Sequence, residues 1–390
     1  MVTVFTSAYN RAYLLGKLYE SLKRQTDYNF EWIIIDDGSR DNTKNLVADW
    51  LRNSTKFKIR YKYVDNGGKH RAINQGVKMA RGEAFFIVDS DDLLTPNAIS
   101  FINAHFREIS INDSFAGIAG LKKSYVDNRI IGGEPYFDTY VDATNFEREK
   151  YGLLKDKAEV YKTSILKKFP FPEFEGETFL TEGVVWDAIA YAGLKIRWYN
   201  TVLYLCEYIA DGLTRNGYEK FRDNPFGWAF YIVQRKRFGV LFGEKLFLEQ
   251  FKFYEREKNK ITESKIRELL QITSEEYNNL AVEMKKVNEE LSAILEKNQI
   301  KKIALYGYGV NAKRLLEYFS NFDVEVYCVI DKNYREVKCS SAYSLEMEIP
   351  DVDSVCVTLC NPEEEIMIRL KTKLPNCFIW KLADLNNRVW

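Results

Sequence analysis

The sequence is poor in histidine and has no paired cysteines. It contains 2 His and 6 Cys in 390 residues, with no CxxC pair, and five of the cysteines lie after position 325. Zinc sites need clustered Cys and His ligands, so this composition argues against a zinc site. Scattered thiols fit a reducing cytosol better than a disulfide framework.

Net charge and long hydrophobic runs are also missing. The 56 basic and 56 acidic residues cancel to a formal net charge of zero, which excludes the strongly basic field typical of nucleic-acid binding. No run of about 18 apolar residues is present, so we expect no membrane-spanning helix. Strand-like sequence begins at Val2 and leaves no room for a signal peptide, which predicts a cytoplasmic protein.

Aromatic residues are abundant, at 15% of the chain with 25 Tyr and 25 Phe. Such rings suit cores, sugar-stacking sites and membrane interfaces alike, so their number alone selects none of these. The length suffices for two or three domains.

The N-terminal part alternates four times between a buried strand and an amphipathic helix, and each strand ends in a polar or glycine-rich tip. The predicted strands are residues 2–6, 30–35, 59–64 and 85–88. This alternation predicts an open α/β sheet with its ligand site along the carboxyl ends of the strands.

Two of these tips have distinct physical uses. Asp36 and Asp37 offer acceptors for the N–H groups of a base, while Gly67-Gly68 allows backbone to approach a ligand closely. Lys69 and His70 can neutralise phosphate. Each tip alone is also compatible with an ordinary turn, but successive tips of one sheet together favour a binding site.

The fourth strand, 85–88, runs directly into Asp89, Asp91 and Asp92 and then into Thr95-Pro96, which fits a helix start. Crowded carboxylates repel one another unless a cation lies between them, so a divalent metal carrying a phosphorylated ligand is the natural candidate. Taken alone, the stretch fits an acidic strand-to-helix loop with a helix cap better than a metal site, because acidic caps are common.

These motifs together resemble family 2 glycosyltransferases, inverting enzymes of the GT-A fold, over roughly residues 1–215. The stretches that carry the resemblance are Thr6-Ser7-Ala8-Tyr9-Asn10-Arg11, Ile35-Asp36-Asp37-Gly38-Ser39, Asn66-Gly67-Gly68-Lys69 and the DXD-type Asp89-Ser90-Asp91-Asp92. Ala8 stands where the family usually has proline, which should affect the rigidity of the strand tip more than the chemistry.

The resemblance implies roles for these residues. Those implied in binding the donor nucleotide are Thr6, Ala8, Tyr9, Asp37, Gly67, Gly68, Lys69, Asp89 and Ser90. The first strand tip and Asp37 would hold the base, most often uracil, and Asp89 would approach the ribose. Asp91 would bind Mn²⁺ or Mg²⁺ on the diphosphate, with Asp92 assisting, because the departing diphosphate develops charge that must be stabilised.

Inverting transfer also needs a carboxylate that takes the proton of the acceptor hydroxyl. The family usually places it four residues before a Trp, and counting back from Trp186 gives Glu182 as the base. Asp187 is the alternative but follows Trp186 and should face elsewhere on the helix. Glu182 could also simply favour the N-terminus of that helix electrostatically.

Residues 115–200 should form the acceptor side. The elements predicted there and just beyond are a hairpin over 124–133 with Asp127-Asn128 in its loop, a Pro- and Glu-rich loop over 170–177, and short strands over 196–199 and 202–208. A loop containing Arg215 follows, where Arg215 could meet the diphosphate or be a solvated surface residue.

The character changes at Asn224. Aromatic and basic residues mix over 224–255, which suits either a membrane interface or helices that pack on the catalytic domain. Residues 256–299 are highly charged and predict connecting helices or a short coiled segment.

The C-terminal part opens with a strand over 303–306 and a GxGxxA pattern formed by Gly307, Gly309 and Ala312. A second strand ends in Asp331, about 20 residues on, as in dinucleotide-binding folds. Further strands are predicted around 354–359 and 377–380. Two interpretations stay open: a second nucleotide or sugar-nucleotide site, or a structural or oligomerising module.

We therefore predict three domains: a GT-A catalytic domain over 1–222, a helical connector over 223–299 and a half-size Rossmann-like domain over 300–390. The predicted activity is metal-dependent inverting transfer of a sugar from a nucleotide donor to a bacterial surface glycan, free or lipid-linked, in polysaccharide biosynthesis. The alternatives are a sugar-nucleotide-sensing scaffold and a two-activity enzyme whose C-terminal domain modifies the sugar. Peripheral contact with the inner face of the cell membrane and homo-oligomerisation complete the expected partners.

Overall fold

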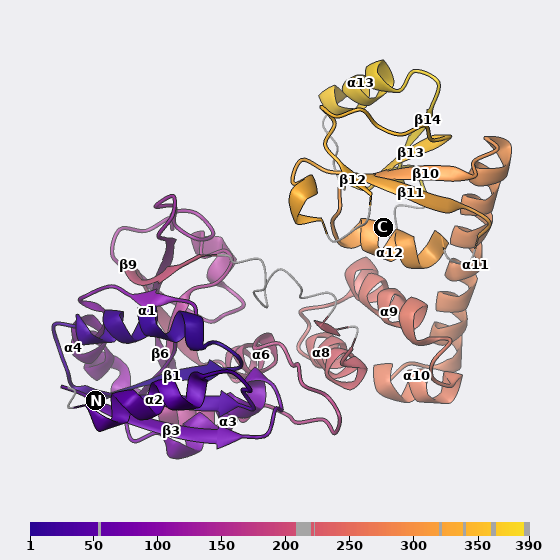
Figure 1. Ribbon diagram of the computed structural model, residues 1–390. Helices are drawn as coiled ribbons and strands as arrows, with labels where there is room; N and C mark the ends of the chain where they lie inside the picture. The colour runs from indigo at the N-terminus through magenta and orange to yellow at the C-terminus, as the bar shows by residue number, and fades with distance from the viewer. Residues whose placement is uncertain are drawn as a thin grey trace. The chain divides into compact units, whose positions relative to one another are not determined.

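The computed structural model describes residues 1–390 except 54–55, 208–219, 222, 320–321, 338–340, 360–363 and 386–390. The chain forms two compact units, Met1–Leu241 and Phe242–Trp390 (Figure 1). Arg215 lies outside the described residues. The three-domain division with boundaries at 222 and 299 stays a prediction.

The first unit is an α/β domain. Its strands are β1 (Val2–Ala8), β2 (Phe30–Asp37), β3 (Lys58–Val64), β4 (Ala84–Ile87), β5 (Leu93–Leu94), β6 (Phe115–Ser124), β7 (Tyr140–Ala143), β8 (Ala158–Lys162) and β9 (Lys195–Cys206). Its helices are α1 (Ala12–Lys23), α2 (Thr43–Arg52), α3 (Lys69–Met79), α4 (Ala98–Ser110), α5 (Thr163–Lys168), α6 (Gly183–Tyr191) and α8 (Pro225–Arg237), with a 3₁₀ turn at Arg148–Tyr151.

These strands form one sheet with the order β3-β2-β1-β4-β8-β6-β9-β5, and β7 pairs with β9. Strands β3, β2, β1 and β4 are mutually parallel, so their carboxyl ends meet at one edge. Strand β8 runs antiparallel to both β4 and β6. The site predicted along the strand tips therefore lies at the end of the parallel half.

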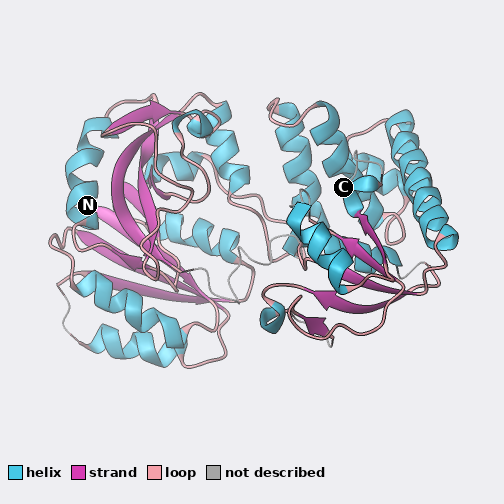
Figure 2. Cartoon of the chain, turned by 90° about the horizontal axis from the view of Figure 1, so that it is seen from above, coloured by secondary structure: helices cyan, strands magenta, loops and turns pink. Residues whose placement is uncertain are grey.

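Helices cover both faces of this sheet (Figure 2). One core joins Val4 and Trp32 to residues of α1, α2 and α4. The other joins Phe5 and Ile33 to residues of α3, α5 and α6. Adjacent residues of β1 and β2 enter opposite cores because strand side chains alternate between faces. Burial on both faces explains the consecutive apolar residues Val4-Phe5 and Ile33-Ile34-Ile35.

The predicted α/β sheet and its four strand–helix alternations are confirmed, with differences further along the chain. The two short strands expected over 196–199 and 202–208 are the single strand β9. The hairpin over 124–133 is a turn closed by one isolated bridge between Lys123 and Ile130. The helix expected from Thr95-Pro96 begins at Ala98, after the two-residue strand β5, which had no sequence signal.

The second unit contains a helical part and a smaller sheet. Its helices are α9 (Gly243–Glu257), α10 (Glu263–Leu270), α11 (Ser274–Lys297), α12 (Val310–Phe319) and α13 (Glu364–Lys373). Its strands are β10 (Lys302–Tyr306), β11 (Glu325–Ile330), β12 (Ala342–Tyr343), β13 (Ser354–Val357) and β14 (Phe378–Lys381). All pairs in this sheet are parallel, in the order β12-β11-β10-β13-β14, as a Rossmann-like module requires.

The helices of residues 224–299 divide between the two units, since α8 belongs to the first and α9–α11 to the second. Trp228 of α8 and Phe251 of α9 are buried, whereas Phe242 is 71% exposed. No helix in the described part of the chain is long and apolar enough to cross a bilayer.

Candidate active site

The tip of β1 was predicted to hold the base. Thr6 is fully buried, and its hydroxyl accepts a hydrogen bond from the Trp32 indole nitrogen at 3.0 Å. Ala8 is also buried, while Tyr9 is 49% exposed at the strand end. The Thr6 side chain thus serves the core, and Tyr9 is the residue of this tip that is open to a ligand.

Asp37 lies at the end of β2 and holds the glycine turn before α3. Its two carboxylate oxygens accept hydrogen bonds from the backbone N–H groups of Gly67 and Gly68, each at 2.8 Å. Burial raises the pKa of Asp37 above its ordinary value, although these N–H groups oppose the shift. The carboxylate is therefore engaged by the chain's own backbone.

Asp89, Ser90, Asp91 and Asp92 form the turn after β4. Ser90 and Asp92 are buried, and the Asp92 N–H donates to the Asp89 carbonyl at 3.2 Å. The Asp89 N–H donates to the Tyr204 hydroxyl of β9 at 2.8 Å, which fixes the start of the turn.

The carboxylates of this turn differ in charge state. Burial would raise the pKa of Asp89, but Lys69 and Lys122 together hold it below its ordinary value. Burial and the neighbouring Asp89 raise the pKa of Asp91, and the same two causes raise the pKa of Asp92 to about 8. Asp89 therefore carries the fixed negative charge of the turn.

Asp91 is the residue of this turn that could hold a divalent cation. Among the described residues Asp91 makes no ion pair, and its raised pKa marks a half-buried carboxylate that a cation would relieve. No group of three or more His, Cys, Asp and Glu side chains in the described ranges could hold a metal alone. Diphosphate and water oxygens would have to complete the shell, as is usual for Mg²⁺.

Lys69 connects Glu182 to this turn by ion pairs. Glu182 occupies the N-cap position of α6, and Trp186, four residues on, stacks on Tyr161 with ring centroids 4.2 Å apart. The Lys69 ammonium lies 2.7 Å from Glu182 Oε1 and 2.5 Å from Asp89 Oδ1. The structure thus brings together residues from three separate segments that the sequence singled out.

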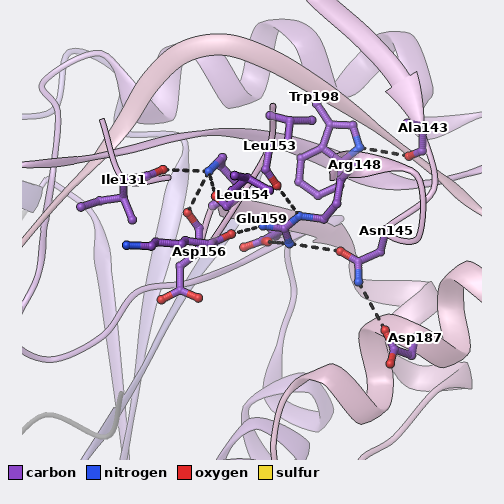
Figure 3. Close-up of polar contacts among 12 residues, drawn as sticks. Ile131, Ala143, Asn145, Arg148, Leu153, Leu154, Asp156, Glu159, Asp187 and Trp198 are labelled. Atoms are coloured by element: carbon purple, nitrogen blue, oxygen red, sulfur yellow. Dashed lines mark hydrogen bonds and ion pairs between the residues drawn. The ribbon is translucent and has the colours of Figure 1, made fainter. Parts of the chain in front are cut away.

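Asp187 faces a different neighbourhood (Figure 3). Its Oδ1 accepts from the Asn145 amide at 3.5 Å, and its Oδ2 lies 3.4 Å from Arg235 of α8. Burial raises the pKa of Asp187 above its ordinary value. The alternative base is therefore tied to the segment around Asn145 and to α8.

A polar network between β7 and β8 had no counterpart in the sequence analysis (Figure 3). Arg148 donates to the Leu153 carbonyl at 2.8 Å and lies 3.6 Å from Glu159, whose pKa burial raises to about 7 against the pull of Arg148. Lys157 donates to the Ile131 carbonyl at 2.8 Å, and burial lowers its pKa to about 8. These charged residues lie close together in sequence but form no motif, so only the three-dimensional contacts reveal the network.

The glycine-rich loop of the second unit is closed by Asp331. One carboxylate oxygen accepts from the Tyr308 N–H at 2.7 Å and the other from the Asn333 N–H at 2.8 Å. Gly307 has a positive φ of 90°, Gly309 has open space at its Cβ position and Ala312 is buried. The GxGxxA geometry is present, with its acid bound to the loop backbone.

Comparison with known proteins identifies the first unit. Residues 3–119 match the sequence model of the family described as "Glycosyl transferase family 2". Glycosyltransferase GlyG of Streptococcus pneumoniae serotype 4 is 31% identical over 108 residues, covering 28% of this chain and 36% of GlyG. The putative glycosyltransferase EpsH of Bacillus subtilis (strain 168) is 32% identical over 96 residues, covering 25% of this chain and 27% of EpsH.

Solved structures give a weaker likeness. S. aureus TarS 1-349 in complex with UDP has a TM-score of 0.45 and 20% identity, covering 70% of this chain and 76% of that chain. The mannosyltransferase PcManGT from Pyrobaculum calidifontis, in complex with GDP-Man and Mn²⁺, has a TM-score of 0.42 and 15% identity, covering 72% of this chain and 86% of that chain.

The first unit carries its polar site at the carboxyl ends of parallel strands, where open α/β sheets bind ligands. The match over residues 3–119 shows a family 2 glycosyltransferase domain in this part of the chain, in agreement with the predicted family. The matched stretches span about a third or less of the curated relatives, at 36% of GlyG and 27% of EpsH.

Proposed function

We propose that the chain is a metal-dependent inverting glycosyltransferase that moves a sugar from a UDP-linked donor to a hydroxyl of a surface glycan. The observation that carries the proposal is the position of the Lys69 ammonium, 2.5 Å from Asp89 and 2.7 Å from Glu182. The Lys69 ammonium thereby joins Asp89, the strand-tip acid that suits a donor, to Glu182, the carboxylate that suits an acceptor.

In the proposed reaction Glu182 takes the proton of the acceptor hydroxyl. The hydroxyl oxygen forms a bond to the anomeric carbon of the donor sugar while the bond from that carbon to the diphosphate breaks, and the configuration inverts. The bonding electrons leave with the nucleoside diphosphate. Glu182 at the N-cap of α6 is partly exposed and can meet an incoming hydroxyl, whereas Asp187 is buried against Asn145 and Arg235.

Donor binding would use the strand tips. Asp89 faces the ribose, Ser90 follows it in the turn, and the first strand tip holds the base beside Asp37 and Gly67-Gly68. Asp91 would hold Mn²⁺ or Mg²⁺, which when bound supplies positive charge to the departing diphosphate.

The acceptor is proposed as a glycan of a capsule, an O-antigen or a similar surface polymer, free or carried on a lipid. The exposed aromatic side chains of the 224–255 segment, including Phe226 and Phe242, are compatible with peripheral contact with the inner face of the cell membrane. A sugar-nucleotide-sensing scaffold would bind donors in the same way but would not turn them over.

The test is turnover of a panel of nucleotide sugars by the full chain with Mn²⁺, followed by release of the nucleoside diphosphate. We expect Glu182→Gln to retain UDP binding and lose transfer by about three orders of magnitude, since it removes the general base. Asp91→Ala, or chelation of the wild type, should reduce turnover to a similar extent.

Matched controls are available on the surface of the same domain. Glu175→Gln lies in the loop before α6 and Asp49→Ala lies on α2, and both residues are exposed, so both variants should turn over donors at the wild-type rate. Wild-type-like turnover by Glu182→Gln would move the base elsewhere. Turnover that survives both Asp91→Ala and chelation would exclude the metal assignment.

A further inference from the structure

We propose that Lys69 is a positioning residue for Glu182, acting through its ammonium rather than as a ligand of the donor. This inference rests on the proposed function, because it gives Lys69 a part in the same transfer step. In this role Lys69, the residue after the glycine turn, holds Glu182 at a fixed position relative to Asp89.

The first support is the pair of contacts that Lys69 makes. A lysine ammonium has three donors, and two of them are directed to Asp89 Oδ1 at 2.5 Å and Glu182 Oε1 at 2.7 Å. Burial would lower the pKa of Lys69, but these two carboxylates raise it above its ordinary value. Charge-assisted hydrogen bonds of this length are the strong ones, so the contact fixes both acids.

The second support is the rigidity of the element that presents Lys69. It is the first residue of α3 and follows Gly68, whose φ is 92°. A Cβ at Gly68 would lie 1.7 Å from the Thr178 carbonyl oxygen, so the turn packs directly on the segment that leads to Glu182. Asp37 holds the same turn through the N–H groups of Gly67 and Gly68. The backbone that carries the Lys69 side chain is therefore held in a fixed position.

The third support is that Asp89 is itself anchored. Its N–H donates to the Tyr204 hydroxyl at 2.8 Å, and its carboxylate is held by Lys69. The Lys69 ammonium lies 2.7 Å from Glu182 Oε1, so both acids are held by the same cationic group. A carboxylate so held is preorganised for transfer, which is where positioning contributes to rate.

The competing role, which the sequence favoured, is direct neutralisation of the donor phosphate by Lys69. The two roles of Lys69 predict effects on different measured quantities. A phosphate ligand acts on donor affinity and independently of Glu182, whereas a positioning residue acts on the transfer step and only while Glu182 is a carboxylate.

The experiment is a double-mutant cycle in the full chain with Lys69→Met, Glu182→Gln and the double variant, measuring kcat and the Kd of UDP with Mn²⁺. We expect Lys69→Met to lower kcat about 100-fold and to change the Kd of UDP less than about threefold. In the Glu182→Gln background the same change should cost less than about threefold in kcat, because non-additivity marks residues that act as a unit. Lys69→Arg, which keeps the charge, should recover at least about tenfold of the lost kcat.

Lys78→Met is the matched control, since Lys78 is exposed on the same helix and should leave kcat unchanged. Loss of UDP affinity in parallel with kcat, or an additive double variant, would overturn the inference and return Lys69 to the phosphate.

A readout without turnover keeps the inference separable from the proposed function. The ¹⁵N signal of the Lys69 ammonium, assigned by its loss in Lys69→Met, should shift in Glu182→Gln and stay in place in Lys78→Met. An unmoved signal would overturn the inference while transfer stands. A wild-type chain that turns over no nucleotide sugar would remove the proposed function, and the role in transfer with it.

Discussion

The charge of each carboxylate in the site depends on the groups within its reach. Asp89 keeps its charge because Lys69 and Lys122 outweigh the effect of burial on its pKa. Asp92, three residues after Asp89 in the same turn, has its pKa raised to about 8 by burial and by Asp89. Asp91 is half-buried whereas Asp92 is buried, which favours Asp91 as the proposed metal ligand, with Asp89 as the fixed anion.

His70 provides a pH test at the same scale. It is 2% exposed, and among the described residues its Nδ1 has no hydrogen-bond partner. Burial, and then the nearby Arg71, lower the pKa of His70 from 6.5 to about 4. Between these two pH values the unfolded chain binds a proton that the folded chain does not, so stability falls as the pH falls through this window.

We expect the wild type to lose up to about 3 kcal/mol more than His70→Gln when unfolding free energies are compared at pH 6.5 and pH 4. Chemical denaturation at both pH values measures this difference. His105→Gln is the control, because that ring is half-buried, and the one hydrogen bond it makes in the described part of the chain is with Glu108 at 3.3 Å. Parallel pH profiles for wild type and His70→Gln would show that His70 titrates normally in the folded protein.

At the scale of elements, the sequence correctly located a close backbone approach in the turn between β3 and α3, but it did not identify the group that approaches. Gly67-Gly68 indicates close approach of the backbone, and in the structure the group that approaches is the Thr178 carbonyl of the chain itself. Gly68 also adopts φ 92° and ψ 160°, a region that is essentially limited to glycine.

Gly68→Ala should therefore destabilise the protein by about 3 kcal/mol or more, from backbone strain together with the clash against Thr178. Because Lys69 follows directly, donor turnover should fall as well. Gly133→Ala separates the two effects: its φ of 87° carries the strain, but nothing lies within 4 Å of the added Cβ, so about 1 kcal/mol is expected. Equal losses in the two variants, measured by denaturant unfolding, would contradict the packing role of Gly68.

The elements that the sequence predicted are those with local signals. The strands β1 to β4 are short apolar runs followed by polar tips, and each was located within about two residues of its observed bounds. Strand β5 depends on its pairing with the distant strand β9, so its own residues carry no signal. Residues 124–133 did carry a local hairpin signal, but what forms there is the isolated bridge between Lys123 and Ile130. The joining of two predicted strands into β9 likewise depends on its long pairing with β6.

The same limit applies to the site. The sequence indicated Asp89, Asp91 and Glu182 because each stands in a recognisable motif. It did not indicate that Lys69 joins two of them or that Tyr204 holds the Asp89 backbone, because these contacts cross 113 and 115 positions, from Lys69 to Glu182 and from Asp89 to Tyr204. The sequence can therefore predict which residue types the site contains, whereas the contacts between them depend on the three-dimensional fold.

At the scale of the whole molecule, the division of the chain decides which fragment can act alone. All residues proposed for donor, metal and acceptor chemistry lie in Met1–Leu241. Helix α8 is part of this unit by its contacts: Glu177 accepts from the Phe226 and Gly227 N–H groups at 2.6 and 2.8 Å, and Asn224 accepts from Thr178 at 2.8 Å. These bonds hold the segment that leads to Glu182.

We therefore expect a fragment ending at Leu241 to turn over nucleotide sugars within about threefold of the full chain, since it keeps every contact of the site. A fragment ending at residue 222, the predicted boundary, lacks α8 and loses the two hydrogen bonds from Phe226 and Gly227 to the Glu177 carboxylate, at about 1.5 to 3 kcal/mol for each bond to a charged group. It should unfold at lower temperature and lose most turnover.

The comparison needs only thermal unfolding and UDP release for the full chain and the two fragments. An inactive but folded 1–241 fragment would make the second unit integral to catalysis, and a fully active 1–222 fragment would show that α8 does not support Glu182.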